Sequence, residues 1–145
     1  MCLSALSKHQ IIRLPDNLPE SFPAADINTR GNASWKTLFS SEMSAGIACC
    51  PPKGNLGLHK HTQAEVYYIL SGRGTVLIEG QHHVLEPGMT VLIPGDAEHG
   101  VSNEGSEDFR WLYVFPGRFE DVVYRFRNEG RYPVGTDRQV HKAKL

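Results

Sequence analysis

The sequence lacks an excess of charge of either sign and lacks any long run of apolar residues. Its 145 residues include 15 Lys and Arg against 16 Asp and Glu, a formal net charge of −1. Without a basic excess the chain has no electrostatic footprint for nucleic acid or an anionic membrane surface, so we expect neither partner. No segment reaches the length of a membrane span, and residues 1–10 contain no apolar stretch of signal-peptide length. We therefore expect an intracellular, cytoplasmic protein.

Cysteine is also scarce. The three cysteines, Cys2, Cys49 and Cys50, include no Cys-x-x-Cys pair, and adjacent residues have poor geometry for a mutual disulfide. We expect reduced thiols, with Cys49 and Cys50 acting as small buried apolar side chains. The chain length fits one domain with a sizeable core.

Proline and glycine divide the chain into an arm, a barrel and a tail. Residues 1–33 hold three prolines among polar residues and are predicted as an N-terminal arm, with one short strand near Ile11–Leu14. Residues 34–127 alternate short apolar segments with Gly and Pro turns, which is typical of an all-β sandwich or barrel. Residues 128–145 are predicted as a polar C-terminal tail.

One segment of the barrel region has helical spacing. The apolar residues Phe119, Val122, Val123 and Phe126 fall at i, i+3, i+4 and i+7. This spacing predicts a short amphipathic helix that closes one end of the barrel.

The pair His59 and His61 is the strongest chemical signal. Side chains two residues apart on a strand project from the same face, so both imidazoles can reach one ion. Glu65 opens a segment rich in β-branched and aromatic residues, which predicts a second strand that returns a carboxylate to that ion. His99 follows a further strand and turn and can supply a third imidazole. Three nitrogens and one carboxylate suit a divalent first-row metal: iron, manganese, nickel, copper or zinc.

These residues, with the glycines around them, resemble the two motifs of the cupin superfamily. The first motif is represented by Gly54, His59, His61, Glu65 and Gly72, and the second by Gly88, Pro94, His99 and Asn103. Gly54 lies one residue nearer to His59 than in the usual pattern. Asp96 stands where the family usually has glycine, which affects the local turn but not the ligands.

The resemblance implies a double-stranded β-helix barrel, similar to a jelly roll, with one metal ion inside. It also implies assembly as a homodimer through edge strands or the N-terminal arm. Four protein ligands leave coordination positions open on an octahedral ion, which favours catalysis on a small-molecule substrate.

Tyr67 is the candidate catalytic residue. It lies two residues after Glu65 and should share its face, pointing into the barrel, while Val66 and Tyr68 point outward. A phenol beside a divalent ion can act as a general base, although an aromatic core residue with a satisfied hydroxyl explains Tyr67 equally well. On the strand from 109 to 115 either Trp111 and Tyr113 or Arg110 and Leu112 face inward, and periodicity does not choose between them. His82 and His83 follow a hairpin turn and are predicted at the surface.

Three functions remain open on these residues. The first is a metal-dependent lyase or dehydratase that abstracts a proton from a carboxylate or carbonyl substrate. Small cupins that act as dimethylsulfoniopropionate lyases look like this, including the tyrosine two residues after the glutamate. The second is an iron-dependent dioxygenase with the same ligands, and the third is a non-catalytic cupin that binds a small molecule. The Glu-x-Tyr arrangement favours the lyase.

Overall fold

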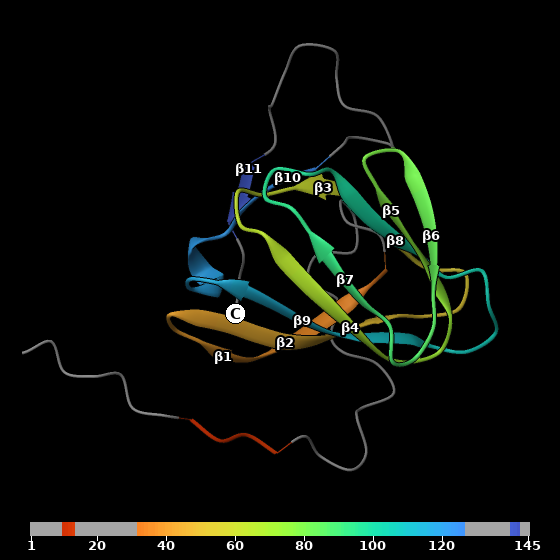
Figure 1. Ribbon diagram of the computed structural model, residues 1–145, viewed down its shortest axis with the longest axis horizontal. Helices are drawn as coiled ribbons and strands as arrows, with labels where there is room; N and C mark the ends of the chain where they lie inside the picture. Colours follow the sequence, from red (N-terminus) through yellow and green to blue (C-terminus); the bar gives the residue numbers. More distant parts are fainter. Residues whose placement is uncertain (1–9, 14–31, 127–139, 143–145) are drawn as a thin grey trace, which may run out of the picture.

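The computed structural model of the protein describes residues 10–13, 32–126 and 140–142 (Figure 1). Within these ranges nearly all regular structure is β-strand. The strands are β1 (Ser34–Ser40), β2 (Met43–Cys50), β3 (Asn55–Lys60), β4 (Glu65–Ser71), β5 (Gly74–Ile78), β6 (Gln81–Leu85), β7 (Thr90–Ile93), β8 (His99–Ser102), β9 (Phe109–Pro116), β10 (Val123–Phe126) and β11 (Val140–Lys142). One 3-10 turn, η1 (Phe119–Asp121), lies between β9 and β10.

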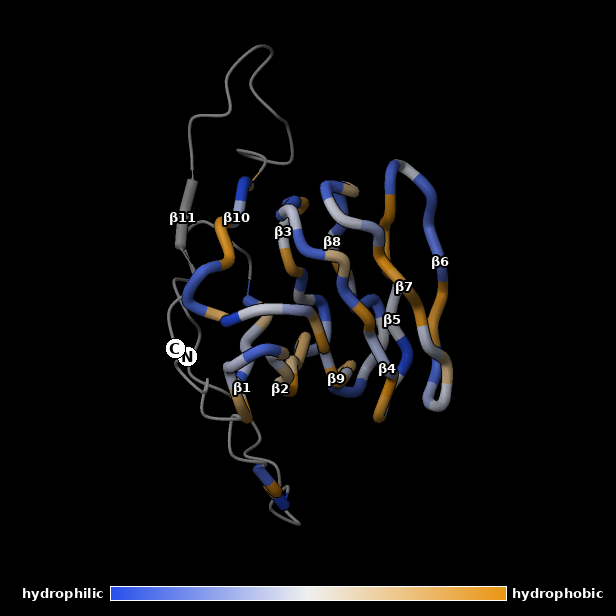
Figure 2. The backbone as a smooth tube through the Cα atoms, turned by 60° about the vertical axis from the view of Figure 1, so that its left-hand side comes forward, coloured by the Kyte–Doolittle hydropathy of each residue, from blue (hydrophilic) through white to orange (hydrophobic). Residues whose placement is uncertain are grey.

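The strands form two antiparallel sheets that face each other. One sheet has the order β1-β2-β9-β4-β7 and the other has the order β11-β10-β3-β8-β5-β6. Figure 2 shows β1, β2, β9 and β4 along one side of the molecule and β10, β3 and β8 along the opposite side. Strands distant in sequence are therefore neighbours, as in a jelly roll. This arrangement confirms the predicted all-β barrel.

The core lies between the two sheets and follows strand alternation. The inward face of β9 supplies four buried aromatic side chains: Phe109, Trp111, Tyr113 and Phe115. Along β4, Tyr67 and Ile69 are buried at 2% and 1% exposure, whereas Tyr68 between them is 42% exposed. Successive side chains on a strand point to opposite faces, so one face of each strand fills the barrel.

The predicted helix is present only as the single turn η1. From Val123 the chain is extended and forms β10, which pairs antiparallel with β3. β-Branched and aromatic residues such as Val123 and Tyr124 favour a strand, and pairing with β3 outweighs the helical spacing of the apolar residues. The prediction of a helix continuing from Phe119 to Phe126 is therefore wrong beyond η1.

The two terminal segments are described only in part. Gln10–Arg13 contains no strand, and Ile11 is 91% exposed, so the strand predicted near Ile11 is not formed there. The rest of the arm before Asn32 lies outside the described residues. Within the predicted polar tail, Val140–Lys142 forms β11 because β10 offers an edge with which it can pair. No helix among the described residues is long and apolar enough to cross a membrane.

Candidate metal centre and pocket

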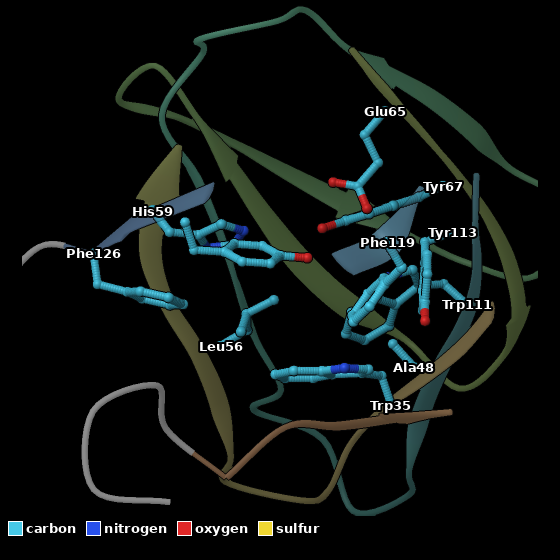
Figure 3. A pocket seen from close by; sticks show the side chains of 11 residues that line it. Trp35, Ala48, Leu56, His59, Glu65, Tyr67, Trp111, Tyr113, Phe119 and Phe126 are labelled. Carbon is cyan, nitrogen blue, oxygen red and sulfur yellow. The ribbon is translucent and has the colours of Figure 1, made fainter. Parts of the chain in front are cut away.

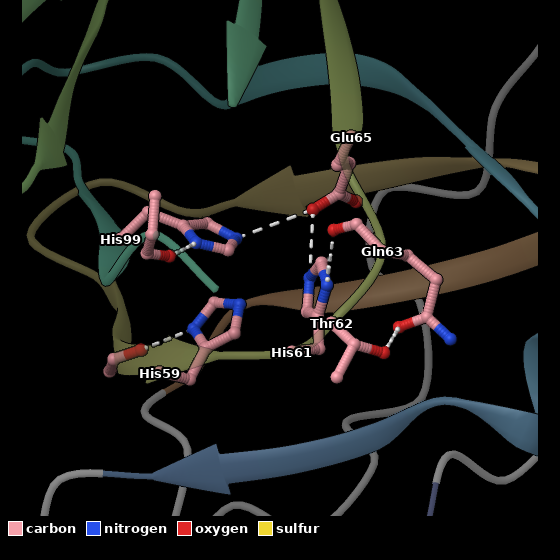
Figure 4. Close-up of polar contacts among 8 residues, drawn as sticks. His59, His61, Thr62, Gln63, Glu65 and His99 are labelled. Atoms are coloured by element: carbon pink, nitrogen blue, oxygen red, sulfur yellow. Dashed lines mark hydrogen bonds and ion pairs between the residues drawn. The ribbon is translucent and has the colours of Figure 1, made fainter. Parts of the chain in front are cut away.

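Three buried histidines converge inside the barrel. His59 lies near the end of β3, His61 follows that strand, and His99 begins β8. One ring nitrogen from each lies within 4.8 Å of the others, so the three side chains could hold a metal ion. Glu65, the first residue of β4, extends its carboxylate to the same place (Figure 4). Its Oε2 lies 3.2 Å from Nε2 of His61 and 3.3 Å from Nε2 of His99.

The backbone fixes the orientation of each imidazole. Nδ1 of His59 donates to the Gly57 carbonyl at 2.7 Å, and Nδ1 of His61 donates to the Gln63 carbonyl at 3.0 Å. Nδ1 of His99 donates in the same way to the carbonyl of Ala97 at 2.9 Å. A carbonyl oxygen only accepts, so Nδ1 carries the proton and a neutral ring presents its Nε2 lone pair to the centre. Bonds of this kind orient histidine ligands in metal sites.

The charges of the buried histidines and of Glu65 favour a bound cation. Burial, then the nearby His99 and His61, lower the pKa of His59 well below its ordinary value, so its ring is neutral. Burial alone would raise the pKa of Glu65, but interactions with His61 and His99 lower it to about 2. Nε2 of His99 is buried without a hydrogen-bond partner. Glu65 Oε2 lies 3.2 Å from Nε2 of His61 and 3.3 Å from Nε2 of His99, distances at which a proton or a metal cation must separate the atoms, and this donor set fits a divalent first-row ion.

The turn before His99 holds the two halves of this centre together. The Asp96 N–H donates to the His61 carbonyl at 2.8 Å. Asp96 has a φ of 62°, a conformation that aspartate tolerates better than most residues, so it can replace the glycine of the family motif. A Cβ on Gly95 would lie 2.3 Å from the Thr62 carbonyl oxygen, so the close approach of the two segments requires glycine there.

A pocket of about 420 Å³, its open mouth included, begins beside the candidate ligands (Figure 3). Its lining residues are Trp35, Ala48, Leu56, His59, Glu65, Tyr67, Trp111, Tyr113, Phe119, Tyr124 and Phe126. Figure 3 shows the Tyr67 hydroxyl directed toward the Glu65 carboxylate. Burial, then the Glu65 charge, raise the pKa of Tyr67 well above its ordinary value. The structure therefore brings the predicted ligands and Tyr67 together.

The orientation of β9 is now settled. Trp111 and Tyr113 face the pocket, and Arg110 does not. The Arg110 guanidinium instead donates to the Asp108 carboxylate at 2.9 Å, close to the outward-facing Cys49. The alternative of an inward Arg110 is therefore wrong. His82 and His83 are exposed on β6, as predicted.

The lining of the pocket by strand β10 was not predicted from the sequence. Tyr124 and Phe126 of β10 line the pocket. The ring of Tyr124 lies 5.6 Å from that of His59 and 5.3 Å from that of His61, between centroids. The Val-Val-Tyr run at 122–124 was the signal that could have indicated a strand with an inward tyrosine.

Comparison with known proteins identifies the family. The family model Cupin_2, described as a cupin domain, matches residues 46–115. Dimethylsulfoniopropionate lyase DddW of Ruegeria pomeroyi is 37% identical over 140 residues, an alignment that covers 85% of this chain and 89% of that protein. This chain is a cupin.

Other relatives of this cupin differ in function and cover less of it. The oxalate-binding protein of Thermotoga maritima is 34% identical over 65 residues, 44% of this chain and 54% of that protein. The solved structure of TT1209 from Thermus thermophilus matches with a TM-score of 0.56 at 31% identity, over 59% of this cupin and 84% of that chain. The relatives of this cupin thus include both an enzyme and a binding protein.

Proposed function

We propose that this cupin is a metal-dependent lyase acting on a small carboxylate that carries a cationic leaving group. The observation that carries the proposal is the division of the pocket into two ends. One end holds the candidate metal ligands with Tyr67 beside them, and the other is built from aromatic side chains. The 37% identity to a dimethylsulfoniopropionate lyase supports this choice.

The pocket lining selects the class of substrate. Seven of its eleven residues are Trp, Tyr or Phe, and none of the described lining residues is Lys or Arg. Phosphorylated substrates generally require such cations, so the lining does not favour them. The faces of aromatic rings attract a sulfonium or quaternary ammonium group, most strongly when water is excluded. A sulfonium-substituted propionate, the compound that appears in the relative's name, fits both ends.

We propose that His59, His61, Glu65 and His99 hold one divalent metal ion. When bound, such an ion supplies Lewis-acid polarisation of the substrate carboxylate, which acidifies the neighbouring C–H. Burial and the Glu65 charge favour the protonated phenol of Tyr67, whereas the positive charge of a bound ion would favour its phenolate, and that phenolate would take the proton α to the carboxylate. The C–H electron pair forms the carbon–carbon double bond, and the pair of the carbon–sulfur bond leaves with the neutral sulfide.

Replacement of Tyr67 tests the base. General bases commonly contribute about 10²–10⁴-fold to rate, so Tyr67→Phe should lower kcat by that factor while KM and metal content change little. Tyr68→Phe is the matched control, because its side chain lies on the outward face of β4. The assay is release of dimethyl sulfide from dimethylsulfoniopropionate, with oxygen uptake recorded in parallel. Unchanged kcat in Tyr67→Phe would remove it as the base, and stoichiometric oxygen uptake would favour a dioxygenase.

Metal analysis tests the ligands separately from the reaction. The double variant His59→Ala, His61→Ala should lose the metal, because it removes two of the three converging imidazoles. The control is His82→Ala, His83→Ala, which removes two exposed histidines from β6. Metal content per chain after purification is measured by mass spectrometry. Equal metal content in the two double variants would contradict the assignment.

A further inference from the structure

Two tryptophans flank a single methyl group on the floor of the pocket. Trp35 of β1 pairs with Ala48 of β2, and Ala48 pairs in turn with Trp111 of β9. Adjacent strands lie about 4.8 Å apart, so the two tryptophans stand on strands about 10 Å apart, with only alanine between them. All three residues line the pocket, and Figure 3 labels each of them there.

The pocket has room beside Ala48 because the inward side chains of β2 are small. The inward residues of this strand are Ser44, Gly46, Ala48 and Cys50. At Gly46 the space is already taken, because an added Cβ would lie 2.1 Å from the Tyr113 hydroxyl oxygen. Ser44 and Cys50 are fully buried outside the pocket lining. Ala48 is therefore the position on β2 where a small side chain leaves room for a ligand.

We propose that Ala48 is a specificity-determining residue that sets the size of the cationic head group held between Trp35 and Trp111. This proposal rests on the proposed function for the identity of the substrate, but the binding it describes needs neither turnover nor metal. Two indoles that line the same pocket can attract a compact onium group through the faces of their rings, and we call the space between them the slot. The methyl of Ala48 limits how deeply that group enters.

Two substitutions at this position have opposite consequences. Ala48→Val adds two methyl groups to the floor and should exclude a tetramethylammonium ion that the natural protein accepts. Ala48→Gly deepens the floor and should admit the larger tetraethylammonium ion. Ala45→Val is the matched control, because Ala45 is a buried alanine of the same strand that points to the opposite face.

The chain reports on this pocket through its own fluorescence. It contains two tryptophans, Trp35 and Trp111, and both line the pocket. Tryptophan emission and calorimetry on the full-length protein therefore measure binding of tetramethylammonium and tetraethylammonium chloride at the slot. We expect Ala48→Val to weaken tetramethylammonium binding at least about tenfold, equal to ~1.4 kcal/mol, and Ala45→Val to leave it within about twofold. Ala48→Gly should shift the preference toward tetraethylammonium by about tenfold.

The results separate this proposal from the lyase. Equal binding of tetramethylammonium by Ala48→Val and Ala45→Val, or no binding by the natural protein, would overturn the role of Ala48. If Ala48→Val does not fold, unchanged ion preference in Ala48→Gly would overturn it instead. Binding that depends on Ala48, without any release of dimethyl sulfide from dimethylsulfoniopropionate, would sustain the slot and reject the lyase. If Ala48→Val releases dimethyl sulfide at the same rate as the natural protein, the role of Ala48 would be rejected and the proposed lyase activity would stand.

Discussion

The buried amide of Asn103 should be worth several kilocalories per mole to the barrel. Asn103 follows β8 and is fully buried. Its Nδ2 donates to the carbonyls of Cys50 at 2.9 Å and Glu107 at 2.7 Å, and its Oδ1 accepts from the Gly105 N–H at 2.9 Å. One side chain thus joins the end of β2 to the loop before β9.

The expected cost of Asn103→Ala follows from what each partner loses. The Cys50 carbonyl is deeply buried, and leaving it unsatisfied costs about 1–3 kcal/mol. The other two partners are only partly buried, so water can replace the amide there and each loss costs about 0.5 kcal/mol. We therefore expect the free energy of unfolding to fall by about 2–4 kcal/mol.

Urea unfolding of the metal-free protein measures this change. The control is Asn55→Ala, an exposed asparagine whose backbone pairs with the neighbouring Ser102, and its effect should stay within about 0.5 kcal/mol. A loss below about 0.5 kcal/mol in Asn103→Ala would refute the reasoning, because it would mean that the three hydrogen bonds contribute no net stability.

Two further predictions concern β2. Gly46→Ala should destabilise the fold by about 1–3 kcal/mol, because the new Cβ would lie 2.1 Å from the Tyr113 hydroxyl oxygen and 2.5 Å from the Lys36 carbonyl oxygen. A melting temperature equal to that of the natural protein would contradict this prediction. Burial raises the pKa of the Cys50 thiol from about 9 to about 12, so above pH 9 the unfolded chain releases this proton while the folded protein keeps it. Stability should therefore fall between pH 9 and 12, and Cys50→Ala should lose stability less steeply in urea unfolding at pH 8 and pH 10. An identical pH dependence in the two proteins would reject the role of Cys50.

Most strands and the inward face of β4 could be predicted from the sequence. The residues after Glu65 favour a strand, and successive side chains on a strand point to opposite faces. If Glu65 points into the barrel, Tyr67 must therefore point into it as well. The close spacing of His59, His61 and Glu65 in the sequence predicts that these three residues bind the same ion. These are local relations, which a single sequence records.

Relations between distant strands could not be predicted in the same way. Both faces of β9 are largely apolar, because Leu112 and Val114 alternate with the inward aromatics, so periodicity gave no choice. Arg110 points outward because its neighbour Trp111 points inward, and its ion pair with Asp108 on the outward face is a contact that the sequence does not reveal. Tyr124 was missed because the apolar spacing before it suits a helix, whereas pairing of β10 with β3 decides its conformation.

Three of the four candidate ligands lie within seven residues of one another, from His59 to Glu65. An unfolded chain retains this short segment and therefore part of its affinity for a divalent ion. Stabilisation by a ligand reflects only the difference between its affinities for the folded and unfolded states. The rise in melting temperature on adding metal should accordingly be smaller than the affinity of the folded site alone would give. That difference comes from His99, which only folding brings to the other three, and from the backbone hydrogen bonds that orient each imidazole in the folded protein.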